Sequence, residues 1–212
     1  MAQQRPGMLT AVAIIAIVIG VLGSCVSSFT FASTLAQGPL NEFNRANLES
    51  MQGANPEMLQ RQLETQDRLQ EIAESWQPFT LTHQVLNLFA SLALGIAGIL
   101  LLRWKPMALG LFVGAAAASI FVDVIGTVLG IVVQLQMKPI MREMMAGAAE
   151  AAPGMGDTMG AVGEASASVG MCMGALFLVV KVAYYVWGIV VVRKDAIRSL
   201  FAAQSAAQSA GQ

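Results

Sequence analysis

The stretch that decides the fold runs from Leu81 to Leu135 and reads LTHQVLNLFASLALGIAGILLLRWKPMALGLFVGAAAASIFVDVIGTVLGIVVQL. It holds two apolar runs, 81–102 and 107–135, separated by the short polar segment 103–106. Each run exceeds the roughly 18 to 20 residues with which a helix crosses a bilayer. Two further runs of this kind, 8–36 and 169–192, lie nearer the ends of the chain. The sequence therefore predicts an all-α fold, a single membrane domain built as a bundle of four transmembrane helices.

The segments outside these runs differ in charge, and the difference predicts their side of the membrane. Acidic residues outnumber basic ones in the segments 37–80 and 136–168, whereas basic residues dominate near the N-terminus, in 103–106 and in the tail 193–212. Lys and Arg in short flanking segments are retained on the cytoplasmic side. We therefore expect both termini in the cytoplasm and both acidic segments outside it. The basic residues in question are Arg5, Arg103, Lys105, Arg193, Lys194 and Arg198.

The first outer segment, 37–80, carries a helical pattern of its own. After Asn55-Pro56, apolar residues from Leu59 to Trp76 recur at approximately helical spacing among Gln, Glu and Arg. This pattern predicts an extracytoplasmic amphipathic helix between the first two spans. Three roles stay open for it: docking on a partner, lying on the outer lipid surface, or extending the second span as a helical stalk.

The second outer segment, 136–168, is rich in Met, Gly and Ala, and its part 146–168 is expected to be a mobile connector. Met137, Met141, Met144 and Met145 fall on one side of a helix. Thioethers are ligands for Cu(I), which makes copper binding one interpretation. The other interpretation is that Met, an adaptable side chain, fills irregular apolar surfaces.

The two cysteines, Cys25 and Cys172, both lie inside predicted spans, so neither indicates an extracytoplasmic disulfide framework. The residues Leu22 to Cys25, after a basic start and an apolar run, are similar to the end of a bacterial lipoprotein signal. Apolar residues continue beyond Cys25, however, which favours a retained first helix.

Two charged residues lie inside predicted spans, where charge is costly and is usually paired or turned toward the bundle interior. Asp123 is in the third span and Lys181 in the fourth, and the reach of the lysine allows them to pair. Tyr184 or Tyr185 and Ser119 share the faces on which the two charges lie. The pair either fixes the register of two helices or forms a proton or ion relay with Asp123 as the carrier.

Small residues recur along each span and predict close helix packing, because they allow backbones to approach one another. His83 and Asn87, one turn apart near the outer start of the second span, are expected to form hydrogen bonds between helices. The alternative is that they contact a cavity lined by hydroxyl groups of the first span. The candidate packing residues are Gly20, Ser24, Gly95, Gly126, Gly130, Gly170, Gly174 and Gly188.

Two segments resemble parts of uncharacterised small four-helix integral membrane proteins of bacteria. They are 5–22, with its basic-Pro start, and 92–111, which contains Gly-Ile-Leu-Leu-Leu-Arg-Trp-Lys-Pro. The resemblance covers the membrane segments, implies a bacterial cytoplasmic membrane protein and carries no activity to transfer. The four-span topology is shared with tetraspanins and claudins. The sequence lacks the Cys-Cys-Gly signature of tetraspanins and the paired loop cysteines of claudins.

The residues contain no P-loop, no nucleophile with its base and no metal-binding cluster of His, Cys and carboxylates. We therefore expect no enzyme, no cofactor and no metal, and the lack of a basic tract argues against nucleic acid. The favoured function is a scaffold or accessory subunit in the lipid bilayer that binds other membrane or envelope proteins. The alternative is a small oligomeric ion- or proton-coupled permease or channel that uses Asp123 and Lys181.

Overall fold

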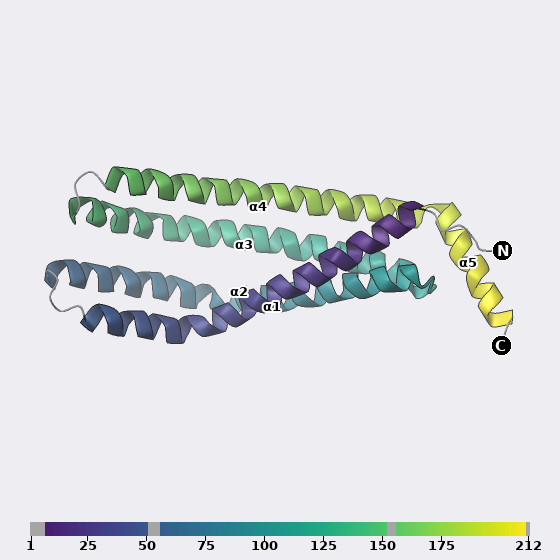
Figure 1. The fold of residues 1–212 in the computed structure, drawn as a ribbon, viewed down its shortest axis with the longest axis horizontal. Helices are drawn as coiled ribbons and strands as arrows, with labels where there is room; N and C mark the ends of the chain where they lie inside the picture. The colour runs from purple at the N-terminus through teal and green to yellow at the C-terminus, as the bar shows by residue number, and fades with distance from the viewer. Residues whose placement is uncertain (1–6, 51–55, 152–155, 211–212) are drawn as a thin grey trace. The chain divides into compact units, whose positions relative to one another are not determined.

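The computed structural model describes residues 7–50, 56–151 and 156–210. Within these ranges the chain forms five α-helices and no strand (Figure 1): α1 (Gly7–Ser50), α2 (Pro56–Leu102), α3 (Met107–Ala151), α4 (Gly156–Arg193) and α5 (Asp195–Ala210). Each of α1 to α4 contains a segment long and apolar enough to cross a membrane. The prediction of an all-helical, multi-pass membrane protein is confirmed.

The four long helices extend well beyond their apolar runs. They contain 44, 47, 45 and 38 residues. At 1.5 Å per residue these lengths correspond to about 57 to 70 Å, against a hydrocarbon core of about 30 Å. Each helix is thus longer than the hydrocarbon core is thick. A large part of each helix can therefore lie outside that core.

The described residues of the segments 37–80 and 136–168 are therefore helical. Helix α1 continues to Ser50 and α2 begins at Pro56, while α3 continues to Ala151 and α4 begins at Gly156. The expectation of a mobile connector over 146–168 is wrong for the described residues of that segment. The amphipathic pattern before Trp76 is not a separate helix, because it forms the first part of α2. The physical reason is that Gln, Glu, Met and Ala favour helix, so an apolar run ends before the helix does.

The chain divides into two compact units, and each of α1 to α4 contributes to both. Unit 1 comprises Met1–Thr30, His83–Ile125 and Phe177–Gln212. Unit 2 comprises Phe31–Thr82 and Gly126–Leu176. Unit 1 therefore holds parts of all four apolar spans together with α5.

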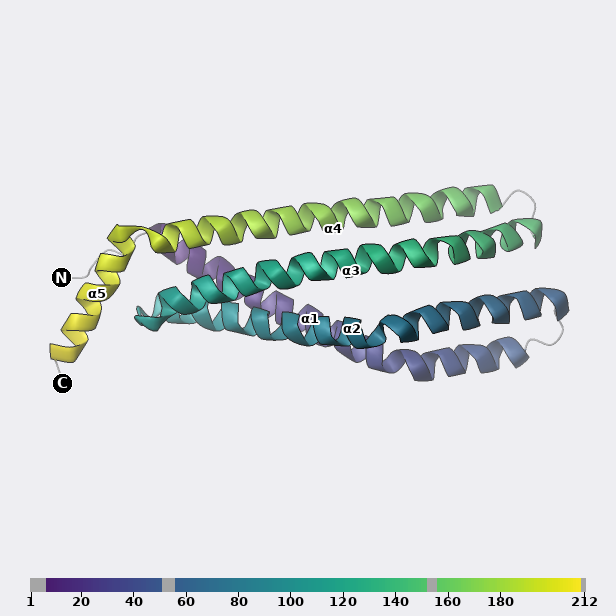
Figure 2. The ribbon, with the colours of Figure 1, turned by 180° about the vertical axis from the view of Figure 1, so that it is seen from behind.

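Unit 1 is organised around an apolar core between α1, α2, α3 and α4. In both views the part of α1 in this unit runs obliquely to the other three helices (Figures 1 and 2). Large apolar side chains on its outer faces are exposed, including Phe89 at 65% and Phe121 at 68%, as lipid-facing side chains are. The fully buried side chains at its centre are Val12, Leu94, Leu101, Phe112, Tyr185, Val191 and Val192.

The turn between α2 and α3 closes α2 with a Schellman motif. The Lys105 amide donates to the Leu100 carbonyl over 3.1 Å, and the Trp104 amide donates to the Leu101 carbonyl over 3.2 Å. Trp104 occupies the left-handed position, with φ of 55°, which Gly usually takes. Its ring lies 4.9 Å from that of Phe201 on α5. The tail expected after 193 thus contains a helix packed against this turn.

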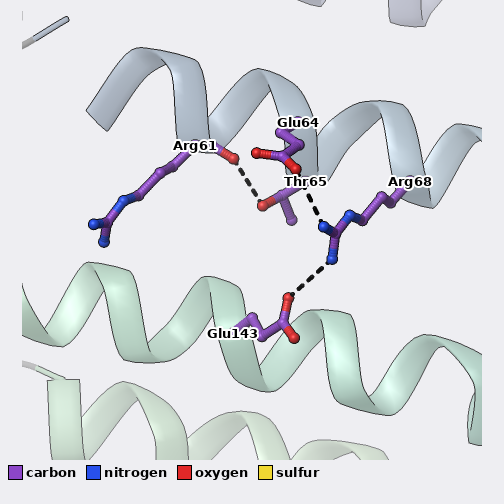
Figure 3. A network of polar contacts seen from close by, with 5 residues as sticks. All are labelled: Arg61, Glu64, Thr65, Arg68 and Glu143. Carbon is purple, nitrogen blue, oxygen red and sulfur yellow. Dashed lines mark hydrogen bonds and ion pairs between the residues drawn. The ribbon is translucent and has the colours of Figure 1, made fainter. Parts of the chain in front are cut away.

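Unit 2 joins α2 to α3 through polar side chains. The Trp76 indole N–H donates to the Gln136 side-chain oxygen over 2.7 Å. Arg68 lies 3.1 Å from Glu64 on its own helix and 3.5 Å from Glu143 on α3 (Figure 3). Because the Arg68 and Glu143 side chains are 54% and 64% exposed, this ion pair contributes at most about 1 kcal/mol.

Candidate functional site

The centre of the candidate site is the ion pair between α3 and α4. The Lys181 ammonium donates to Asp123 Oδ1 over 2.7 Å. The two side chains are 18% and 14% exposed, so the surrounding protein covers most of their surface. The antiparallel course of α3 and α4 brings together two residues that are 58 positions apart in the chain. The structure thus places the pair inside the bundle, within one chain.

Aromatic and hydroxyl side chains surround this pair. The Lys181 ammonium lies 5.9 Å from the ring centre of Tyr185 and 6.0 Å from that of Phe177, distances at which a cation is attracted to an aromatic face. Tyr185 is 1% exposed, and its hydroxyl interacts with Ser119 on α3. Two aromatic rings and the carboxylate therefore all lie close to the ammonium group.

Tyr184 lies next to Tyr185 in the chain but contacts a different helix. Its hydroxyl donates to the Val12 carbonyl of α1 over 2.7 Å. Of the two tyrosines that the sequence left open, Tyr185 faces the ion pair and Tyr184 links α4 to α1. Nothing in the sequence indicated the Val12 acceptor, because every residue carries a backbone carbonyl.

Two further hydrogen bonds join the remaining neighbouring helices of unit 1. Asn87 on α2 donates to the Ser27 hydroxyl of α1 over 2.9 Å, and Ser27 is 3% exposed. The His83 ring nitrogen lies 3.1 Å from the Val122 carbonyl of α3. Each neighbouring pair among α1 to α4 is thus connected by at least one polar side chain, as expected for interfacial hydrogen bonds within a membrane bundle.

Two hydroxyl groups of α1 bond within their own helix and so give no support to the cavity that was the alternative for His83 and Asn87. Ser24 donates to the Gly20 carbonyl over 2.7 Å, and Thr30 donates to the Val26 carbonyl over 2.9 Å, both within α1. A small hollow lies elsewhere, near the α2–α3 turn. Its volume is about 10 Å³, which is room for roughly one water molecule. It is lined by Leu9, Thr10, Leu101, Leu102 and Trp104.

The candidate packing glycines fall into two groups. A Cβ on Gly20 would lie 2.6 Å from the Gly95 backbone nitrogen, so α1 and α2 cross in direct backbone contact there. A Cβ on Gly188 would lie 2.8 Å from the Phe112 ring. A Cβ on Gly130 or Gly174 would meet no described atom within 4 Å, so their role in helix packing stays a prediction.

The remaining small residues add contacts that were not predicted from the sequence. A Cβ on Gly98 would lie 2.8 Å from the Ala13 carbonyl, which makes Gly98 a further close approach between α1 and α2. Its spacing of three from Gly95 was the available signal. Gly126 on α3 is half-buried. The surroundings of Gly170 lie outside the described residues.

Metal binding finds limited support in the described part of the chain. No group of three or more His, Cys, Asp or Glu residues there is placed to hold a metal ion. Met137 is half-buried and Met141 is 44% exposed. The side chains of Met144 and Met145 lie outside the described residues, so the copper interpretation stays a hypothesis. Cys25 and Cys172 are exposed free thiols.

Comparison with known protein families, with curated proteins and with solved structures finds no match to this chain. The geometry of the bundle and of its polar contacts is therefore the basis on which a function is proposed.

Proposed function

We propose that this chain is a non-enzymatic integral membrane scaffold or accessory subunit that binds other membrane or envelope proteins. The observation that carries the proposal is the closed Asp123–Lys181 pair, with its 2.7 Å contact and its largely covered side chains. Opposite charges in direct contact neutralise one another, and a buried charge is costly to leave unpaired. The pair therefore serves to hold α3 against α4 in one register.

The binding surface that we propose lies on unit 2. Its helix segments carry exposed apolar side chains beside charged ones: Phe43 is 63% exposed, Phe79 is 58% exposed and Met141 is 44% exposed. Glu71 and Glu74 are also exposed. Aromatic and methionine side chains are enriched at the centre of protein interfaces, and polar residues form the solvent-accessible rim. A partner would thus bind the helix segments that continue beyond the apolar spans.

We place the protein in the cytoplasmic membrane of a bacterium, with both termini in the cytoplasm. The support is the distribution of charge. Four exposed basic residues lie next to the ends of spans: Arg103, Lys105, Arg193 and Lys194. In this orientation unit 2 carries the extracytoplasmic parts of the chain.

A second candidate is an oligomeric proton- or ion-coupled permease or channel. It is favoured by one observation, the presence of an ionisable pair within two spans. In that case Asp123 would carry the ion and Lys181 would modulate it, with Tyr185 as the neighbouring hydroxyl group.

Two measurements discriminate between these functions. For the scaffold, a photo-crosslinking residue at Glu71 is expected to form a defined adduct with one other envelope protein, which then co-purifies in fixed ratio in a mild detergent. The matched control is the same residue at the exposed, membrane-embedded Phe89. The scaffold function would be contradicted if the residue at Glu71 formed no adduct. It would also be contradicted if the amounts of adduct at Glu71 and Phe89 were equal.

For the permease, the purified protein is reconstituted into liposomes that contain a pH-sensitive dye. We expect no flux above that of empty liposomes. Proton or cation flux that is present in the wild type and lost in Asp123→Asn would establish the second candidate instead.

A further inference from the structure

The end of unit 1 that carries the α2–α3 turn and α5 is strongly basic. Arg103 and Lys105 lie on the turn, Lys194 lies between α4 and α5, and Arg198 lies on the first turns of α5. All four are exposed. Among the exposed residues of these two segments, Asp195 is the acid. The turn and α5 lie at the same end in both views (Figures 1 and 2).

These basic residues adjoin the ends of the candidate membrane spans. The second span ends at Leu102, the third begins at Ala108 and the fourth ends at Arg193. Residues 103–107 and the residues after 193 thus follow or precede a span directly, where the headgroups of a bilayer are expected. Trp104, between Arg103 and Lys105, is the kind of residue that is enriched at this interface. Phosphate groups of phospholipids are the anions present at that depth.

Tertiary contacts assemble the two basic segments into one surface. The ring of Phe201 on α5 packs 4.9 Å from that of Trp104 on the turn. Ile197 and Phe201 are 6% and 2% exposed, so the apolar side of α5 is already covered by the bundle itself. The amides of Ile197 and Arg198 both donate to the Lys194 carbonyl, which begins α5 directly after α4. The start of α5, the positive end of its dipole, therefore lies among the basic side chains.

We propose that Arg103, Lys105, Lys194 and Arg198 form a docking surface for the headgroup phosphate of an anionic phospholipid of the surrounding bilayer. The contact between Phe201 and Trp104 holds the two halves of this surface together. Charge complementarity identifies the occupant, since basic residues next to a span are attracted to anionic lipid. This lipid preference is independent of the scaffold function proposed above.

Native mass spectrometry of protein extracted into detergent with equal amounts of phosphatidylglycerol and phosphatidylcholine tests the proposal. We expect the wild type to retain phosphatidylglycerol in preference. Arg103→Gln combined with Arg198→Gln is expected to lower that preference by roughly fivefold for each charge removed. Arg61→Gln combined with Arg68→Gln removes two exposed charges from unit 2 and is expected to leave the preference unchanged.

A third variant tests whether the surface is assembled by tertiary contacts. Phe201→Ala removes no charge, yet it is expected to reduce the preference severalfold, with helix content unchanged by circular dichroism. Equal retention of both lipids by the wild type would overturn the proposal. An equal loss of lipid preference in the Arg103/Arg198 variant and the Arg61/Arg68 variant would overturn it as well. Displacement of the lipid by millimolar inorganic phosphate would identify a free-phosphate site instead. An unchanged preference in Phe201→Ala would overturn the role of α5.

Discussion

At the scale of single residues, the Asp123–Lys181 pair shows how a charge is retained inside a membrane protein. Each group alone would favour water strongly over hydrocarbon. Together, with a 2.7 Å contact and two aromatic rings about 6 Å from the ammonium group, they form a neutral unit that the bundle covers. Removal of one partner leaves the other charge uncompensated.

We predict that Asp123→Asn lowers the free energy of unfolding by about 3 kcal/mol, because Lys181 then remains charged without its carboxylate. The double variant Asp123→Asn with Lys181→Met is expected to recover most of this loss. Denaturation by sodium dodecyl sulfate in mixed micelles measures both. Direct pairing loses its support if the double variant is no more stable than the single one.

We predict a strong dependence on side-chain size at Gly20 as well. Gly20→Ala places a Cβ 2.6 Å from the Gly95 nitrogen, which α1 and α2 can relieve only by moving apart. A loss of about 1 to 3 kcal/mol is expected from such overpacking. Gly114→Ala on α3 is the control, because its Cβ would meet no described atom within 4 Å. Comparable melting temperatures for the two variants would show that the helices do not cross at Gly20.

At the scale of elements, the helices extend beyond the apolar runs, at the C-terminal end in α1 and α3 and at the N-terminal end in α2 and α4. Helix α2 includes Pro78, whose ring removes one backbone hydrogen bond, and still continues from Pro56 to Leu102. The side-chain contacts of Trp76 and Arg68 with α3 support this part of α2 from outside. The contacts with α3 thus help to keep α2 helical around Pro78.

Hydrogen exchange provides the test of this continuity. In the wild type, amides between 60 and 77 are expected to exchange at least tenfold more slowly than an unstructured chain. Pro78→Ala restores an N–H that bonds to the Glu74 carbonyl, so the exchange around that position should slow further. Exchange at the rate of an unstructured chain between 60 and 77, in either protein, would contradict the helix over this segment.

At the scale of the whole molecule, the distribution of charge determines the orientation that we propose. Lys105 lies on the α2–α3 turn, and Glu71 lies in the part of α2 that precedes its apolar run; both are exposed. The two positions are therefore expected to lie on opposite sides of the membrane.

Cysteine labelling in intact cells measures this orientation. In a background where Ser replaces Cys25 and Cys172, Glu71→Cys is expected to react with a membrane-impermeant maleimide. Lys105→Cys should react only after the cells are opened. The reverse pattern would invert the topology, and labelling of both in intact cells would contradict a four-span arrangement.

The candidate site was predictable in part, and the limit has a physical cause. Asp123 and Lys181 are conspicuous because charge is rare in apolar runs, so the sequence indicated both members of the pair. It did not separate Tyr184 from Tyr185, because adjacent residues on a helix differ in direction by about 100°, and either face was open to contact. The interhelical acceptors Val12 and Val122 were not identifiable, since their backbone oxygens are common to all residues.

The sequence by itself determined that this protein belongs in a lipid bilayer. The transfer of a long apolar run from water to lipid is favourable whatever residues lie near it in the fold. Only the tertiary structure decided where the helices end, which glycines meet another backbone and that α5 packs on Trp104. Those features depend on contacts between residues far apart in the chain, such as Gly20 with Gly95 and Trp104 with Phe201. Hydrophobicity is a property of each residue alone, whereas packing is a property of pairs that the fold brings together.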